Sequence, residues 1–379
     1  MTDRATTPTY KTQNIIWRAA ERQFSGWTLQ GVSLSSEGTL ILDTEVAQPG
    51  KDSHARSEYN GRNFFNGGDF FVGEAVSLPI RADFGFTEGI ASWNADTPDG
   101  TWVETQLRVQ VGKRWTEWYS MGVWAASCST VERHSVGEQD DSNAVISTDT
   151  LVLKDGLEAM TFQVKLRLFT MDNNVSPQMR GVAIAISTTP FMPTELQPGN
   201  PRVWGKRLDV PQCSQMVYPD GGNVWCSAVS VSMVLAYWAG DLDSPCEQRV
   251  RATVEGVYDW LYDGHGNWPF NTAYAALHNL EAYIARFTSL AQAEPWIERG
   301  VPVIISYAWD KGELDGAAVP SSDGHLGVLV GFDAEGNPVV NDPAAKRDDA
   351  VQRTYNRTQL ETLWLQHSGG TVYIISGER

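Results

Sequence analysis

A change in the spacing of apolar residues, near residue 190 of 379, most limits what this chain can fold into. Before that point, short runs alternate apolar and polar residues, which is the period of strands that bury one face. In the run 101–111, Val103, Leu107 and Val109 share one face. Similar runs, separated by turns rich in Gly, Asn and Asp, occupy 27–34, 39–46, 70–80, 160–170 and 181–188. We therefore expect residues 1–190 to form an all-β, jelly-roll-like sandwich of two antiparallel sheets.

After residue 207 the pattern changes to helical runs followed by strand-like runs. Helices are expected at 225–240, 247–264, 271–284 and 292–300, and strands at 301–308, 325–333, 337–342 and 371–376. Helices first and strands afterwards indicate an α+β domain over 207–379. Prolines recur between the two parts, where they restrict the backbone and remove donors, so residues 191–206 are expected to be a linker.

Charge and composition exclude several classes of function. The formal net charge of −17 argues against nonspecific binding to nucleic acid or to anionic lipid, because both need a basic surface. No run of about 18 apolar residues is present, so we expect no membrane span. The first residues lack the apolar core of a signal peptide, so we expect a soluble protein, cytoplasmic as given or secreted with its signal removed.

Metal-binding patterns are weak in this sequence. The acidic run 137–143 together with Asp149 matches no calcium-loop spacing, and a solvated turn is the expected interpretation. Paired Cys or His motifs for zinc are missing, so we expect neither a metal nor a cofactor. The four cysteines, at 128, 213, 226 and 246, are too sparse for a disulfide scaffold. We expect free thiols, although the sequence leaves a single Cys213–Cys246 bridge open.

Cys226 stands at the start of the helix expected over 225–240. The free N–H groups and partial positive charge of a helix N-terminus stabilise a thiolate and lower its pKa. A thiolate is the nucleophile that attacks a carbonyl carbon. A buried, inert cysteine is the alternative at this position. Cys213 is a weaker candidate nucleophile because no helix follows it.

His325 begins the strand expected over 325–333, where it can point from the edge of a sheet into a cleft. A neutral imidazole there can take the thiol proton and later protonate a leaving amine. If 325–333 and 337–342 form a hairpin, Asp342 returns to the level of His325 and can orient the ring. Asn341 is the alternative partner, but neighbouring strand residues face opposite ways, so only one of the two can serve. His265 is a rival base that no predicted strand holds.

Gln215 lies eleven residues before Cys226. A side-chain amide there can donate to a developing oxyanion together with the backbone N–H of Cys226. Trp225 and Trp268 are candidates to line a substrate groove, and Asn271 or Thr272 is expected to cap a helix; Asn271 is also a candidate substrate-binding residue.

The order Gln, Cys, His and Asp, in LDVPQCSQ, GGNVWCSAVSVSMVLAYWAG, GHLGVLVGFD and VVNDPAA, resembles the double-glycine, bacteriocin-processing peptidases (cysteine peptidase family thirty-nine) and their stand-alone bacterial relatives. The resemblance covers about 207–379. It implies a papain-like fold with Cys226 as nucleophile, His325 as base, Asp342 as its orienting partner and Gln215 in the oxyanion hole. The chain departs from the family in having Trp225 and Ser227 around the cysteine, and neither a membrane span nor a nucleotide-binding loop follows.

These observations predict a cysteine peptidase or amide hydrolase acting on peptide or peptidoglycan-like amides. An acyltransferase using the same site is one alternative, and a non-catalytic protein that binds surface polymers is the other. The many aromatic residues before residue 190, such as those in 112–124, fit either a packed core or a surface that binds sugar rings. Carbohydrate is therefore a second expected partner, through the N-terminal part.

Overall fold

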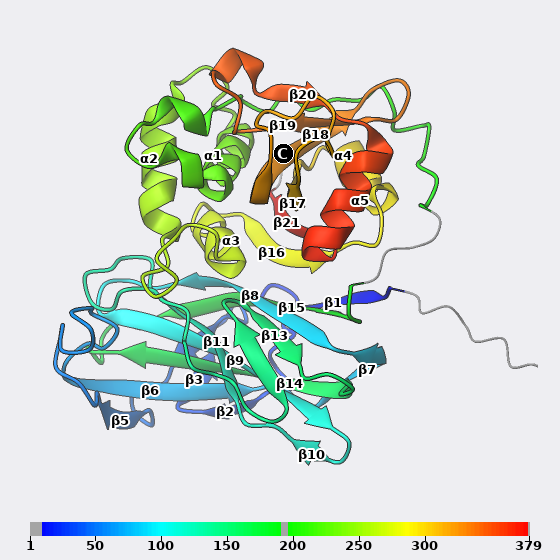
Figure 1. Cartoon of the computed structure of the whole chain (residues 1–379). Coiled ribbons are helices and arrows are strands. Elements are labelled where there is room, and N and C mark those ends of the chain that lie inside the picture. Colours follow the sequence, from blue (N-terminus) through cyan, green and yellow to red (C-terminus); the bar gives the residue numbers. More distant parts are fainter. Residues whose placement is uncertain (1–9, 191–195, 378–379) are drawn as a thin grey trace, which may run out of the picture.

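The computed structural model describes residues 10–190 and 196–377, and it is mostly β-sheet with some helices. Residues 191–195 of the expected linker lie outside the described residues. Two stacked parts are visible in Figure 1, an N-terminal part made of strands and a C-terminal part with helices around a third sheet.

The described N-terminal residues form two antiparallel sheets. One contains β1 Thr12–Arg18, β3 Val32–Leu34, β4 Leu40–Leu42, β8 Glu88–Asp96, β12 Ala144–Ser147, β13 Thr150–Leu153 and β15 Gln178–Ser187. The other contains β2 Thr28–Gln30, β5 Gln48–Lys51, β6 Asp69–Val76, β7 Ile80–Phe86, β9 Thr101–Val111, β10 Arg114–Trp115, β11 Tyr119–Trp124 and β14 Ala159–Thr170. Side chains from both sheets, including Trp93 of β8 and Leu107 of β9, meet in one fully buried cluster.

The expected strand over 101–111 is confirmed as β9, and its Val103, Leu107 and Val109 are fully buried. The single strand expected over 27–34 is wrong, because the chain turns at Gly31 and passes from β2 in one sheet to β3 in the other. Gly31 has a φ of +64°, and a Cβ there would lie 2.8 Å from the Cα of Ala47. Only glycine fits such a crossing without strain.

The C-terminal part surrounds an antiparallel sheet with the order β16-β21-β17-β18-β19-β20 among the described residues. Its strands are β16 Glu281–Arg286, β17 Val303–Trp309, β18 Ser322–Phe332, β19 Pro338–Asn341, β20 Gln352–Thr354 and β21 Thr371–Ser376. Its helices are α1 Cys226–Ala239, α2 Cys246–Val257, α3 Trp268–Ala276, α4 Glu294–Glu298 and α5 Arg357–Ser368, with short 3₁₀ turns at Gln215–Val217, Gly222–Val224, Leu290–Gln292 and Asp348–Ala350. Helices α1 and α2 lie on one side of this sheet and α5 lies near its other side (Figure 1).

Two expected helices are corrected. The helix expected over 271–284 is α3, which ends at Ala276, and the strand β16 begins at Glu281. The helix expected over 247–264 ends at Val257, because the side chain of Asp259 accepts the backbone N–H groups of Leu261 and Tyr262 and turns the chain. Helix α5 was not expected.

The two parts dock through the outer edge of β16. This strand pairs with β21 on one side only, so its other edge needs partners. Side chains of β8 supply them: the Asn94 amide exchanges two hydrogen bonds with the backbone of Ala282, and the Ser92 hydroxyl accepts the N–H of Ile284. The N-terminal part therefore completes an edge of the C-terminal sheet.

Candidate active site

Cys226 is the first residue of α1, and its side chain is half-buried. The preceding residue, Trp225, caps the helix without a side-chain hydrogen bond, so the N–H groups of the first turn are not used by a capping side chain. At the other end, Gly240 closes the helix with a φ of +67°. The cysteine thus has the helix N-terminal position expected from the sequence.

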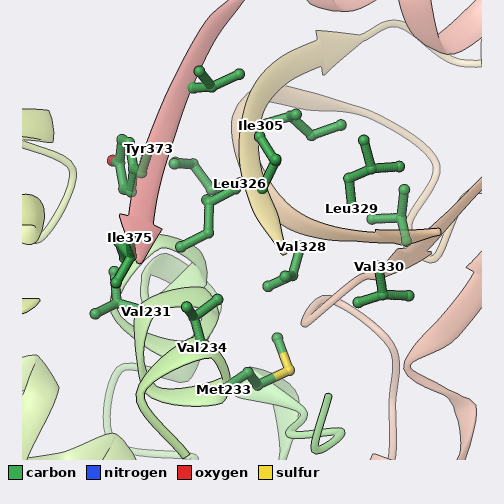
Figure 2. Close-up of a cluster of buried hydrophobic side chains, with 14 of the residues drawn as sticks. Val231, Met233, Val234, Ile305, Leu326, Val328, Leu329, Val330, Tyr373 and Ile375 are labelled. Carbon is green, nitrogen blue, oxygen red and sulfur yellow. The ribbon is translucent and has the colours of Figure 1, made fainter. Parts of the chain in front are cut away.

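Helix α1 is held against strand β18, which carries His325. The Ser230 hydroxyl donates to the carbonyl of Leu326 over 3.1 Å, one residue beyond the histidine. Apolar side chains of α1, including Val231 and Val234, pack toward β18 and β21 in a buried cluster (Figure 2). This packing places the cysteine next to the histidine.

His325 and Asp342 are brought together by the hairpin of β18 and β19, which pairs Val328 with Asn341. Asp342 directly follows β19, and its Oδ1 lies 2.8 Å from Nε2 of His325. His325 is the fourth residue of β18 rather than its first, because the strand begins at Ser322. Since Nε2 bonds to the carboxylate, Nδ1 is the ring nitrogen that remains for the thiol of Cys226, and the interaction with His325 lowers the pKa of that thiol.

Asn341, the alternative partner, faces another way. Its amide donates to the carbonyls of Val210 and Pro211, and its oxygen accepts from the side chain of Gln352. Because successive strand residues face opposite ways, the carboxylate of Asp342, and not the amide of Asn341, faces the imidazole of His325.

Sequence reasoning missed two tyrosines that hold Asp342. Its Oδ2 accepts from the hydroxyl of Tyr355 at 2.5 Å and from that of Tyr307 at 3.2 Å, and its Oδ1 also accepts the N–H of Ala344. Asp342 and Tyr307 are completely buried. Tyr307 pairs directly with His325 across β17 and β18, so a correct strand pairing would have pointed to it.

The rings around His325 restrict it further. Tyr307 and Trp309 both lie edge-on to the imidazole, with ring centroids 5.3 and 5.4 Å away. Trp309 is itself fixed by a hydrogen bond from its indole N–H to the carbonyl of Val319. His325 is only 3% exposed, so these rings separate the His325–Asp342 bond from water.

Charges in the site favour an ion pair. Burial disfavours the thiolate, but His325 and the N–H groups of Leu326 and Ser227 outweigh it and lower the pKa of Cys226. Burial also disfavours the imidazolium, yet Asp342 and Cys226 raise the pKa of His325 to about 10. Asp342 is buried as well, and His325 together with Tyr355 lowers its pKa. Between the pKa values of Cys226 and His325, a thiolate faces an imidazolium.

Gln215 lies in the 3₁₀ turn Gln215–Val217 and is 3% exposed. Its backbone N–H donates over 2.8 Å to the carbonyl of Pro343, the residue directly after Asp342. The neighbouring Ser214 binds the same segment through its hydrogen bonds to Ala345 and Asp348. The Oε1 atom of Gln215 is buried and has no hydrogen-bond partner among the described residues. The side-chain amide is therefore held at the site with an unused acceptor oxygen.

The expectation of free thiols is wrong for two of the four cysteines. Cys213 and Cys246 form a disulfide, whereas Cys128 and Cys226 are free. The sequence could not show this, because 33 residues separate the pair and only the docking of α2 beside the Gln215 turn brings them together. The bridge also removes Cys213 as a candidate nucleophile.

A cavity of about 1140 Å³ opens over the site, and Cys226, His325 and Gln215 are among its lining residues. Trp225 and Trp268, the candidates for a substrate groove, also line this cavity. Its described lining does not include Asn271, which is buried in α3 with its amide donating to the carbonyls of His265 and Asn267. The cap of α3 is Asn267, which corrects the expectation of Asn271 or Thr272.

The rival base His265 also lines the cavity. Its ring lies edge-on to Trp225 and Tyr258, and burial lowers its pKa to about 4. No hydrogen bond joins it to a carboxylate among the described residues, so it lacks the partner that His325 has. Within 10–190 and 196–377, no three His, Cys, Asp or Glu side chains gather as metal ligands.

Comparison with known proteins gave matches to two family models. One, described as Peptidase C39 N-terminal domain, matches residues 14–187, and the other, described as Peptidase_C39 like family, matches residues 207–372. No curated protein matches the chain. Among the described residues, no helix is both long and apolar enough to cross a membrane.

Two solved structures are similar to parts of the chain. One is assigned as a C39-like peptidase from Bacillus anthracis; it is 17% identical with a TM-score of 0.32, over 46% of this chain and 98% of that chain. The other is of carbohydrate-binding modules of the β-sandwich superfamily, 11% identical with a TM-score of 0.14, over 48% of this chain and 57% of that chain.

Both family models belong to the same peptidase group, and they match the two parts of the chain in order. The second match includes Gln215, Cys226, His325 and Asp342. The resemblance noted in the sequence is thereby confirmed at the level of the family: the chain belongs to the C39-like peptidases.

Proposed function

We propose that this protein is a cysteine peptidase or amide hydrolase that uses Cys226, His325 and Asp342 as a triad. The observation that carries the proposal is the hydrogen bond from His325 to Asp342, with Cys226 and His325 together in the lining of one cavity and His325 lowering the pKa of the Cys226 thiol. A nucleophile, a base and an orienting carboxylate in this order are what acyl transfer requires.

The reaction follows from the charges of these groups. The Cys226 thiolate attacks the carbonyl carbon of the amide, and the carbon–oxygen π electrons move onto the oxygen. The Gln215 amide and the N–H of Cys226 are the candidate donors to this oxyanion. As the carbon–nitrogen bond breaks, the His325 imidazolium gives its proton to the leaving amine, and a thioester remains.

Hydrolysis of the thioester completes the cycle. His325, now neutral, takes a proton from a water molecule that attacks the thioester carbon. The carbon–sulfur bond then breaks, the acid is released, and the thiolate–imidazolium pair is restored. Asp342 keeps the ring oriented through both half-reactions and remains charged because two tyrosines donate to it.

We assign the two parts of the chain accordingly. Residues 10–190 are assigned as a jelly-roll-like β-sandwich and residues 207–377 as a papain-like α+β domain. Of the expected linker, the described end packs on the C-terminal part, because Val203 is buried in its core and Trp204 bonds to Glu294. The two facing sheets with a shared core support the first assignment, and the helix α1 packed against an antiparallel sheet supports the second.

The test combines labelling with turnover. Iodoacetamide should alkylate Cys226 before Cys128, and Cys226→Ala should abolish cleavage of peptides that the wild-type protein hydrolyses in a library. Cys128→Ser, the matched control, should keep wild-type activity. Full activity in Cys226→Ala would overturn the proposal, and products joined to an added acceptor amine would identify an acyltransferase instead.

A further inference from the structure

The N-terminal part supplies one wall of the cavity over Cys226. The turn between β12 and β13, residues 147–150, is among the lining segments although it lies outside the C-terminal sheet. Ser147 is exposed and Thr148 is half-buried. A backbone φ of +56° at Thr148 makes the turn tight. These residues therefore border the space where a substrate of Cys226 would lie.

Asp149 joins this turn to the opposite part. It is 5% exposed, and its Oδ2 accepts the backbone N–H of Trp268 over 2.8 Å, at the first residue of α3. Its Oδ1 accepts from the hydroxyl of Thr150. A carboxylate at a helix N-terminus stabilises the helix end, and here it also fixes Trp268, which lines the cavity.

The loop 258–266, which supplies another cavity wall, is held by the N-terminal part as well. The N–H of Ser135 donates to the carboxylate of Asp259, and the N–H of Trp260 donates to the carbonyl of Arg133. Arg133 also donates to the carbonyl of Glu255 at the end of α2. The cavity-lining residues of this loop are Tyr258, Tyr262, Asp263, Gly264, His265 and Gly266.

We propose that the N-terminal part is a specificity element of the active site: its 147–150 turn contacts the bound amide substrate, and Asp149 positions the Trp268 wall. The inference rests on the proposed function. A cavity of about 1140 Å³ exceeds the roughly 300–1,000 Å³ of small-molecule sites, so the substrate is an extended peptide rather than a single amino-acid amide.

If the N-terminal part is instead a separate carbohydrate-binding module, different results are expected. Such a module would bind its ligand on a surface of its own, and changes in the 147–150 turn would leave peptide cleavage unaltered. Titration of the full chain with oligosaccharides measures that activity independently.

The first test narrows the cavity from the N-terminal side. Ser147→Trp places a large ring at an exposed lining position, and Ser142→Trp, at an exposed residue beyond the other end of β12, is the matched control. With a fluorogenic peptide that the wild-type protein cleaves, Ser147→Trp should raise KM at least about tenfold, and Ser142→Trp should keep the wild-type KM. Thermal unfolding of both variants checks that they are folded.

The second test addresses Asp149. Asp149→Ala removes the acceptor of the Trp268 N–H and should change the pattern of peptides cleaved and raise KM. Asp149→Asn keeps an acceptor oxygen and should restore the wild-type pattern. If Asp149→Ala lowers the melting temperature but keeps KM and the cleavage pattern, the positioning role is overturned.

The two proposals fail in distinguishable ways. A wild-type protein that cleaves no peptide overturns the proposed function and this inference with it. An active wild-type protein whose Ser147→Trp variant matches Ser142→Trp in KM and kcat overturns only the inference. Binding of the same peptide to the Cys226→Ala variant, weakened by Ser147→Trp, would support contact without relying on turnover.

Discussion

Nε2 of His325 lies 2.8 Å from Oδ1 of Asp342, in a place where both side chains are buried. The bond fixes which ring nitrogen faces Cys226 and keeps a positive charge on the ring stable. The interaction lowers the pKa of Asp342 and raises that of His325 to about 10.

The pH dependence of activity should reflect this pair. Thiolate forms as the pH rises through the lowered pKa of Cys226, and the imidazolium is lost near pH 10, so kcat/KM should be bell-shaped with its basic limb near 10. Asp342→Asn removes the charge that raises the pKa of His325, so the basic limb should move to lower pH. Initial rates measured across pH give the profiles of the wild-type and Asp342→Asn proteins. A basic limb at the same pH in both would contradict the role of Asp342 beside His325.

Stability should follow the same groups. Because the folded pKa of His325 is raised from 6.5 to about 10, its contribution is complete below 6.5 and is lost as the pH rises toward 10. Because the folded pKa of Asp342 is lowered from 3.8, its contribution is present above 3.8 and is lost at lower pH. Urea unfolding of wild-type and Asp342→Asn protein should therefore differ most between about pH 4 and 6.5.

Tyr355→Phe should weaken the site without removing the triad. It deletes the 2.5 Å hydrogen bond to Asp342 Oδ2, and hydrogen bonds to charged groups contribute about 1.5–3 kcal/mol. We expect a loss of that order in the free energy of unfolding and a lower kcat. Tyr283→Phe, at a tyrosine away from the triad, is the control. Equal effects of the two variants would count against a special role for Tyr355.

The disulfide should support the Gln215 turn. Replacing it with Cys213→Ala and Cys246→Ser together should cost about 2–4 kcal/mol of stability, because the bridge closes a loop in the unfolded chain. Since Gln215 lies two residues after Cys213, kcat should fall as well. Melting temperature and kcat are measured without reductant, with Cys128→Ser as control. An unchanged kcat would show that the disulfide does not affect the position of Gln215 in the active site.

The junction of the two parts contains a buried ion pair between Arg286 and Glu88. Glu88→Ala would leave Arg286, which is 4% exposed, without its carboxylate and should destabilise the protein by roughly 3–5 kcal/mol. The pair Arg347–Asp349 is the control, because both of its side chains are exposed to solvent and Asp349→Ala should leave the free energy of unfolding almost unchanged. Chemical denaturation gives the free energy of unfolding of both variants. Similar losses in Glu88→Ala and Asp349→Ala would show that the Arg286–Glu88 pair contributes little to stability.

How much the sequence could predict differs between local and distant features. The helix beginning at Cys226, the strand β9 and the β18–β19 hairpin follow from local periodicity and turn residues, and all three are present. The helix expected over 271–284 was correct only as far as Ala276, and its C-terminal part was wrong because short apolar runs fit both periods. Residues 281–286 form a strand because they lie at the sheet edge, where they pair with β21 and accept contacts from side chains of β8.

By itself the sequence determined the order of Gln, Cys, His and Asp, and the local elements that carry the last three. Only the tertiary structure decided which groups surround them: Tyr307 and Tyr355 on Asp342, the Cys213–Cys246 bridge, and the 147–150 turn beside the cavity. The physical reason is that local periodicity sets backbone conformation and the buried face of each element. Contacts between residues far apart along the chain depend on how those faces pack.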